Sequence, residues 1–126
     1  MSQSFRTPAK RINPHGAAHA GTGHFIAQRV SAIALAIVLP VFVVTLALSG
    51  APDSFAARSY FASPFGAIVS LLTLTAALYH MRLGLQVVVE DYIHTVATRT
   101  ALLVLNSLLA AGLWLAAAYA LLTLAL

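Results

Sequence analysis

The sequence predicts an all-α membrane protein with three transmembrane helices. Of its 126 residues, 60% are hydrophobic and only 8% are charged, which is too apolar for a water-soluble domain of this size. Three apolar runs each exceed the roughly 20 residues that cross a bilayer as a helix. Little of the chain is left outside these runs, so we expect it to carry no soluble catalytic domain.

We expect the helices at residues 25–48, 64–91 and 99–126. The first contains Pro40, which predicts a kink that a helix bundle tolerates. The second follows Ser63 and begins with a proline, the combination of N-cap and first helical residue that favours a sharp start. A short connection leads to the third.

The chain divides into a polar tail, residues 1–23, and a transmembrane domain, residues 24–126. Glycines and prolines in the tail argue against a stable helix there. His15 and His19 have the i, i+4 spacing of a helical metal site. The same glycines and prolines favour a solvated or partner-bound tail instead.

The third run carries features that predict contacts within a helix bundle. Gly112, Ala116 and Ala120 form a stripe of small residues that favours close helix packing. We expect Asn106 to make a polar contact inside the bundle and Trp114 to pack against a neighbouring helix.

Cysteine usage and charge exclude several classes of function. With no cysteine, the chain forms no disulfide and ligates no iron–sulfur cluster through thiolates. The net charge of +4 does not favour nucleic-acid binding, because most of the chain belongs in lipid. The charge instead follows the positive-inside rule, which predicts a cytoplasmic N-terminus and an external C-terminus. Only Arg58 lies on the external side, against five cations on the other: Arg6, Lys10, Arg11, Arg29 and Arg99.

Residues 79–94 hold the polar groups most suited to a function. His80 is the only histidine deep in an apolar run. On a helix, Asp91 projects within about 20° of His80 and lies about 16 Å farther along the axis, with Gly84 on the same stripe. One helix face is therefore predicted to carry an imidazole, a small residue beside it and a carboxylate at the helix end.

His80 has two interpretations, because a neutral imidazole in lipid needs partners for both nitrogens. It either bonds to a neighbouring helix or ligates a haem iron, for which imidazole is a common axial ligand. No other histidine of this chain lies at mid-membrane depth. The second ligand of a six-coordinate haem with two histidines would therefore come from another chain.

The two arginines of the apolar runs also have alternative roles. Arg29, near the start of the first helix, either snorkels to the headgroup level or binds an anion there. Arg82 projects about 200° around the helix from His80, at a depth where charge is costly and usually faces protein, water or a cofactor. Structural and functional roles both stay open for Arg82.

Two acidic residues, Glu90 and Asp91, end the second run, where the helix dipole disfavours them by about 0.3–1 kcal/mol each. Either cationic partners and water solvate them, or they form a polar site that handles protons or binds a ligand head group. Tyr92 is typical of the membrane interface. A phenol beside a carboxylate also suits recognition of a carbonyl oxygen.

Two motifs resemble those of the hydrophobic membrane anchor of succinate dehydrogenase (respiratory complex II), the smaller of its two anchor subunits, and its alphaproteobacterial members most closely. They are His80-x3-Gly84-x6-Asp91-Tyr92 in the second run and His24-Phe25-x3-Arg29 at the start of the first. The first motif is specific because of its spacing and its Asp-Tyr ending, and the second is supportive. Chain length and the three-helix layout also resemble the family.

The resemblance implies roles for four residues. His80 matches an axial ligand of haem b that is shared with a histidine of the larger anchor subunit. Tyr92 matches a tyrosine that hydrogen-bonds a ubiquinone carbonyl, and Asp91 matches the acid next to it. Arg29 matches an arginine near the haem propionates and the quinone pocket. No firm role follows for Arg82.

The resemblance also implies partners and a location. The larger anchor subunit would complete the helix bundle, and soluble flavoprotein and iron–sulfur subunits would dock on the cytoplasmic side of the bacterial inner membrane, with the C-terminus periplasmic. The chain would then be a non-flavin subunit of an oxidoreductase, without a complete active site of its own. Two alternatives stay open. One is a small transport or assembly protein that uses His80, Arg82 and Asp91 as a proton or ion path, and the other is the anchor of a related, menaquinone-dependent fumarate reductase.

Overall fold

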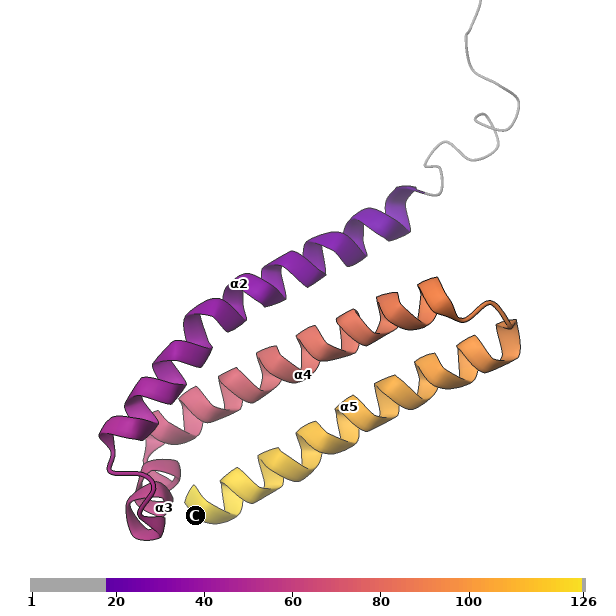
Figure 1. Ribbon diagram of the computed structural model, residues 1–126. Coiled ribbons are helices and arrows are strands. Elements are labelled where there is room, and N and C mark those ends of the chain that lie inside the picture. Colours follow the sequence, from indigo (N-terminus) through magenta and orange to yellow (C-terminus); the bar gives the residue numbers. More distant parts are fainter. Residues whose placement is uncertain (1–17, 126) are drawn as a thin grey trace, which may run out of the picture.

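The computed structural model describes residues 18–125, and its regular elements are all helices (Figure 1). Three long helices, α2 (Ala18–Leu48), α4 (Pro64–Tyr92) and α5 (Val96–Ala125), form the bundle. The short α3 (Ser54–Ala62) lies at the end of the bundle where the chain passes from α2 to α4. Each long helix is long and apolar enough to cross a membrane. The predicted fold class is therefore confirmed.

Helices α2 and α4 run antiparallel, and polar contacts join them at two levels. Ser31 Oγ lies 3.0 Å from His80 Nδ1, and Thr73 Oγ1 lies 3.4 Å from the carbonyl oxygen of Val38. The two contacts are seven residues apart on each helix, which is close to two helical turns, so both use a single stripe of each helix. This pairing turns His80 toward α2.

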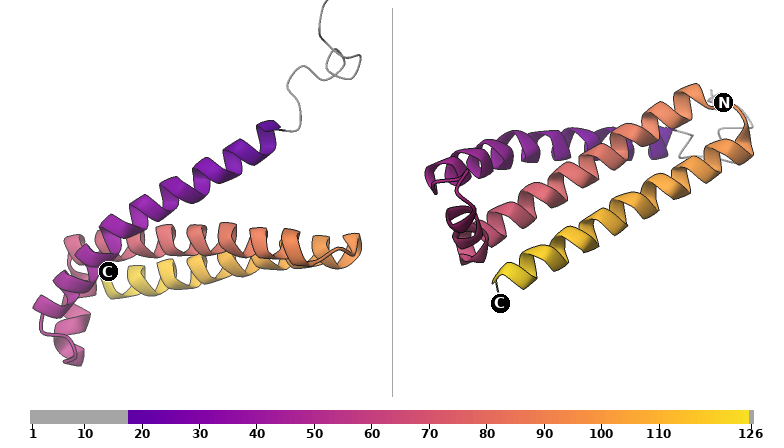
Figure 2. Two further views of the ribbon diagram at one scale, coloured as in Figure 1. Left: turned by 45° about the horizontal axis from the view of Figure 1, so that its top comes forward. Right: turned by 60° about the horizontal axis from the view of Figure 1, so that its bottom comes forward.

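Helices α4 and α5 are also antiparallel, and their contacts repeat with the same period. Trp114 Nε1 donates to Thr75 Oγ1 at 2.9 Å, and seven residues along each helix Arg82 Nε donates to Ser107 Oγ at 3.1 Å. Asn106 Nδ2 donates to the Arg82 carbonyl oxygen at 2.9 Å. The expected contacts of Asn106 and Trp114 are therefore confirmed, and α4 is the central helix of the bundle. Figure 2 shows that α2 diverges from the α4–α5 pair toward its N-terminal end.

Helix caps fix the corner at the α3 end. Gly50 has a φ of 95°, a left-handed conformation that favours glycine after a helix. The Asp53 carboxylate accepts a hydrogen bond from the Ala56 N–H at 2.9 Å and caps α3. Ser63 Oγ accepts from the Gly66 N–H at 3.0 Å and caps α4, with proline as the next residue. The predicted start of the second long helix is confirmed.

Tyr60 attaches α3 to the end of α2. Its side chain is buried, and its hydroxyl forms a 2.8 Å hydrogen bond with Thr45 Oγ1. Its ring centroid lies 6.4 Å from that of Phe42 and 5.4 Å from that of Phe61. Tyr60 therefore helps to hold the short helix against the bundle, with its hydroxyl group hydrogen-bonded.

Two helix boundaries differ from the expected ones. α2 begins at Ala18 rather than near residue 25, and Gly21 and Gly23 lie within it. A glycine costs about 1 kcal/mol relative to alanine inside a helix, which a long apolar helix can absorb. α5 begins at Val96 rather than near residue 99, which shortens its connection to α4. α2 continues through Pro40 and is bent along its length (Figure 1), and a kink at the proline itself stays a prediction.

Two of the three small residues of the α5 stripe do not pack against the other described helices, and the third, Ala120, lines a pocket beside α4. Gly112 and Ala116 are exposed, and a Cβ added at Gly112 would meet nothing within 4 Å. α5 packs instead through the face of Ser107, Ala110 and Trp114, and Ala110 is buried. The expectation of close packing at this stripe is therefore wrong for contacts within the described chain.

Candidate functional site

The polar centre of the bundle is the contact between Ser31 on α2 and His80 on α4. Only 6% of Ser31 is exposed. Its Oγ lies 3.0 Å from His80 Nδ1 and also 3.0 Å from the backbone carbonyl oxygen of Gln28, which can only accept a hydrogen bond. A hydroxyl has a single proton. Both contacts are hydrogen bonds at once only when Ser31 donates to the carbonyl and accepts from an Nδ1–H of His80.

In that arrangement His80 Nε2 carries the free lone pair of the ring. No residue that the structure describes makes a hydrogen bond to Nε2, and the His80 side chain is half-buried. One nitrogen thus bonds to the neighbouring helix, as the first interpretation of His80 requires. The other stays available to a group outside this chain.

Two further polar groups lie on α2 near Ser31. His24, Gln28 and Ser31 stand at i, i+4 and i+7, which places them on one helix face. His24 Nε2 and Gln28 Oε1 are buried, and no described residue bonds to either atom. The Gln28 amide lies against Gly84 of α4, where an added Cβ would be 3.6 Å from Gln28 Nε2. Neither Gln28 nor Ser31 was predicted as a site residue. Polar residues that recur on one face of an apolar helix could have indicated them from the sequence.

Arg82 lies on the side of α4 that faces α5. Its Nε bonds to Ser107, and its backbone carbonyl accepts from Asn106. No carboxylate in the described chain pairs with the guanidinium. His80 faces α2 while Arg82 faces α5, so these two residues do not line a common path within this chain.

The acidic end of α4 is exposed. Glu90 accepts a hydrogen bond from Gln86 Nε2 at 2.8 Å, which compensates one of the two carboxylates. Asp91 and Tyr92 are exposed, Tyr92 by 76%, and no described residue bonds to the Asp91 carboxylate or the Tyr92 hydroxyl. α4 runs unbroken through His80 and Asp91, so both residues lie on the stripe that helix geometry predicts.

Arg29 is exposed near the N-terminal end of α2. Its guanidinium carbon lies 5.2 Å from the centre of the Phe25 ring, a cation–π geometry. It makes no ion pair with a described residue. His15 lies outside the described residues and the side chain of His19 is not among those described, so the hypothesis of a metal site in the tail falls outside the structure.

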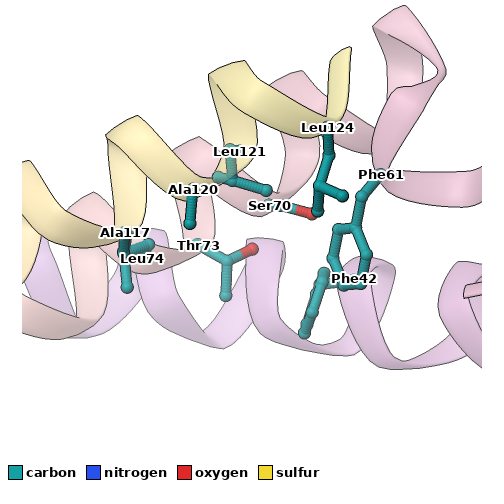
Figure 3. A pocket seen from close by; sticks show the side chains of 9 residues that line it. All are labelled: Phe42, Phe61, Ser70, Thr73, Leu74, Ala117, Ala120, Leu121 and Leu124. Atoms are coloured by element: carbon teal, nitrogen blue, oxygen red, sulfur yellow. The ribbon is translucent and has the colours of Figure 1, made fainter. Parts of the chain in front are cut away.

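An apolar pocket of about 330 Å³ lies toward the other end of the bundle, between α4 and α5 (Figure 3). Phe42 and Phe61 border it, and it contains Ser70, whose buried Oγ has no partner among the described residues. None of the predicted site residues lines this pocket. It is therefore separate from the Ser31–His80 contact.

A family model of the succinate dehydrogenase/fumarate reductase transmembrane subunit matches residues 3–124. The chain belongs to this family. A succinate dehydrogenase hydrophobic membrane anchor subunit from Paracoccus denitrificans is 31% identical over 115 residues, which cover 91% of this chain and 88% of the relative. A protein of the same description from Rickettsia typhi is 28% identical over 108 residues, 86% of each chain. Another from Rickettsia bellii is 31% identical over 105 residues, 82% of this chain and 83% of the relative.

The family model and the relatives confirm the family that the two sequence motifs indicated. These relatives are alphaproteobacterial, as the resemblance implied. Together with the three apolar helices, family membership makes the chain a multi-pass membrane anchor of the succinate dehydrogenase/fumarate reductase family, and its relatives above are succinate dehydrogenase anchors, each part of an oxidoreductase complex. In this anchor, the residues of the longer motif lie along one helix, α4. His80 faces the neighbouring helix, and Asp91 and Tyr92 are exposed at the helix end.

Proposed function

We propose that this anchor supplies His80 as one axial ligand of haem b and contributes Tyr92 and Asp91 to a ubiquinone-reduction site. The soluble flavoprotein and iron–sulfur subunits dock beside that site, on the cytoplasmic face of the bacterial inner membrane. The observation that carries the proposal is the hydrogen bond between Ser31 and His80 Nδ1, which leaves Nε2 without a partner in the described chain.

The residues around His80 fit a haem. A metal-bound histidine usually donates its other ring N–H to a neighbouring acceptor, as the geometry here provides through Ser31. The imidazole is half-buried at the α2–α4 contact, so a planar group at Nε2 would lie between this chain and another. When bound, a haem supplies one-electron transfer.

The second axial ligand is proposed to come from the larger anchor subunit. Of the other histidines on described helices or connections, His19 and His24 lie near the start of α2 and His94 follows the end of α4. None of them is at the level of His80. The unpaired, exposed charge of Arg29 is suited to the propionates, which carry the negative charge of a haem.

The end of α4 fits a quinone because it joins an apolar helix to a polar surface. An isoprenoid tail stays in the hydrocarbon there, while the head group meets polar side chains. The Tyr92 hydroxyl donates to a quinone carbonyl oxygen in this proposal. The Asp91 carboxylate accepts from a cationic group of a partner subunit, which offsets its unfavourable place at the helix C-terminus.

A fumarate reductase anchor is a second candidate, favoured by the family model, whose description names both enzymes. Comparing ubiquinone and menaquinone as electron acceptors of the purified complex separates the two. A proton or ion path through His80, Arg82 and Asp91 is less favoured, because Arg82 bonds to α5 on the other side of α4.

The proposal is tested by purifying the complex in mild detergent through a tag on this chain and recording reduced-minus-oxidised spectra. We expect the flavoprotein, iron–sulfur and larger anchor subunits to copurify with a low-spin haem. His80→Ala should shift the spectrum or the midpoint potential, or release the haem. The control His94→Ala should leave the spectrum, the midpoint potential and the haem content unchanged. An assembled His80→Ala complex with a wild-type spectrum and potential would rule His80 out as a ligand.

A further inference from the structure

We propose that Ser31 is the positioning residue of His80, holding the imidazole in the tautomer and ring orientation that present Nε2 to an iron. The inference rests on the proposed function, because it gives a role to the residue behind the proposed ligand. It starts from the one side-chain hydrogen bond that joins α2 to His80, at 3.0 Å.

Ser31 is fixed as an acceptor by its own helix. Its hydroxyl proton is used on the Gln28 carbonyl oxygen at 3.0 Å, which leaves a lone pair directed at α4. Ser31 is only 6% exposed, so water does not compete for that lone pair. The neutral imidazole satisfies this geometry only with its proton on Nδ1, and this tautomer carries its free lone pair on Nε2.

The contact has two consequences for a metal at Nε2. It restrains rotation of the ring, because a rotated His80 would lose its partner in a buried site. It also makes Nε2 a stronger electron donor, since donation from Nδ1–H moves electron density into the ring. A stronger donor favours the ferric over the ferrous state and therefore lowers the midpoint potential.

The test uses the complete complex, purified through a tag on this chain. Ser31→Ala removes the acceptor at almost constant volume, Ser31→Thr keeps a hydroxyl, and Ser31→Cys keeps the volume with a weaker acceptor. Ser70→Ala is the matched control, since Ser70 is also 6% exposed, lies on α4 ten residues from His80, and has no described partner. The readouts are the midpoint potential, the electron paramagnetic resonance g-values of the low-spin haem, and the rate of haem loss to a scavenging apoprotein.

We expect Ser31→Ala to raise the midpoint potential, to change the g-values and to speed haem loss by roughly 10- to 100-fold, the usual effect of losing such a supporting contact on metal affinity. Ser31→Thr should stay near wild type, Ser31→Cys should fall between the two, and Ser70→Ala should match wild type.

The inference is overturned if Ser31→Ala and Ser31→Cys match Ser70→Ala in potential, g-values and haem retention while His80→Ala still disturbs the haem. Ser31 would then be a packing residue only, and the proposed function would stand. An assembled His80→Ala complex with an unchanged haem would instead overturn both, because no ligand would remain for Ser31 to position.

Discussion

Arg82 and Ser107 join α4 to α5, with the guanidinium Nε donating to the serine Oγ at 3.1 Å. Ser107 in turn donates its own proton to the Leu103 carbonyl oxygen at 3.0 Å. On the opposite side of α4, Ser31 likewise donates its proton to the Gln28 carbonyl oxygen and accepts a hydrogen bond from His80. His80 and Arg82 are thus each held by a serine of a flanking helix, and each serine donates its own proton to a backbone carbonyl of its helix.

This relationship predicts that Arg82 is dispensable for haem and quinone chemistry. Arg82→Met removes one hydrogen bond to a charged group, worth roughly 1.5–3 kcal/mol. It also removes a charge that costs roughly 2.5–3.5 kcal/mol at the centre of a membrane helix. Because the two effects nearly cancel, we expect wild-type amounts of assembled complex, an unchanged haem spectrum and unchanged succinate–ubiquinone activity.

The matching change Arg29→Met provides the contrast, since Arg29 is the cation proposed to lie near the propionates. It should alter the haem potential or the quinone activity where Arg82→Met does not. Loss of succinate–ubiquinone activity with Arg82→Met in an assembled complex would favour the proton-path alternative.

The helices and their faces could be predicted because hydrophobic runs, N-caps and the 100° step per residue are local properties. The opposite directions of His80 and Arg82 follow from that step alone, and their contacts with α2 and α5 bear it out. Their partners, Ser31 and Ser107, could not be identified, because the register between helices is set by packing over their whole length. The prediction of close packing at Gly112 failed within this chain for a related reason. A stripe of small residues marks a surface suited to close packing, but it does not identify the helix that packs there.

From the close approach of α3 to the first turn of α4, we predict that position 66 requires glycine. A Cβ at Gly66 would overlap the carbonyl oxygen of Tyr60, so Gly66→Ala must displace α3 or the first turn of α4. We expect a loss of roughly 1–3 kcal/mol, the usual cost of overpacking, seen as a lower thermal unfolding midpoint of the full chain in detergent. Gly112→Ala is the control, because its Cβ meets open space and alanine favours the helix by about 1 kcal/mol. Equal midpoints for both variants would show that the corner relaxes without cost.

The arrangement of the bundle predicts its topology in the membrane. The N-terminal end of α2 and the α4–α5 connection lie at one end, and the C-terminal end of α5 lies at the other, beside α3 (Figure 1). Arg29 and Arg99 lie toward the first end, and Arg6, Lys10 and Arg11 precede α2 in the sequence, whereas Arg58 is on α3. By the positive-inside rule, the first end should therefore be cytoplasmic. A reporter inserted between Ile93 and Val96 should read as cytoplasmic, and one fused after Leu126 as periplasmic. The reverse pattern would put Asp91 and Tyr92 on the wrong side for a cytoplasmic dehydrogenase.

Tyr92→Phe tests the quinone site directly, because it keeps the ring and removes only the donor. Tyr92 is 76% exposed and its hydroxyl has no partner in the described chain, so the change should not disturb the helix bundle. If the hydroxyl donates to a quinone carbonyl that is buried in the complex, its loss costs roughly 1–3 kcal/mol. That corresponds to a decrease of about 5- to 150-fold in the efficiency of quinone reduction if it is felt in full at the transition state.

Two assays on membranes with matched complex content separate this role from the alternatives. Succinate–ubiquinone activity should fall in Tyr92→Phe, while reduction of a soluble dye by succinate should not, because the dehydrogenase half-reaction lies on other subunits. Tyr119→Phe is the matched control, since Tyr119 is 72% exposed near the end of α5 that lies away from the α4–α5 connection. If both activities of Tyr92→Phe equal those of Tyr119→Phe, Tyr92 is only an interfacial residue, like its control. If both activities fall together, Tyr92 supports docking of the soluble subunits, since a lost quinone contact cannot slow electron transfer from succinate to the dye.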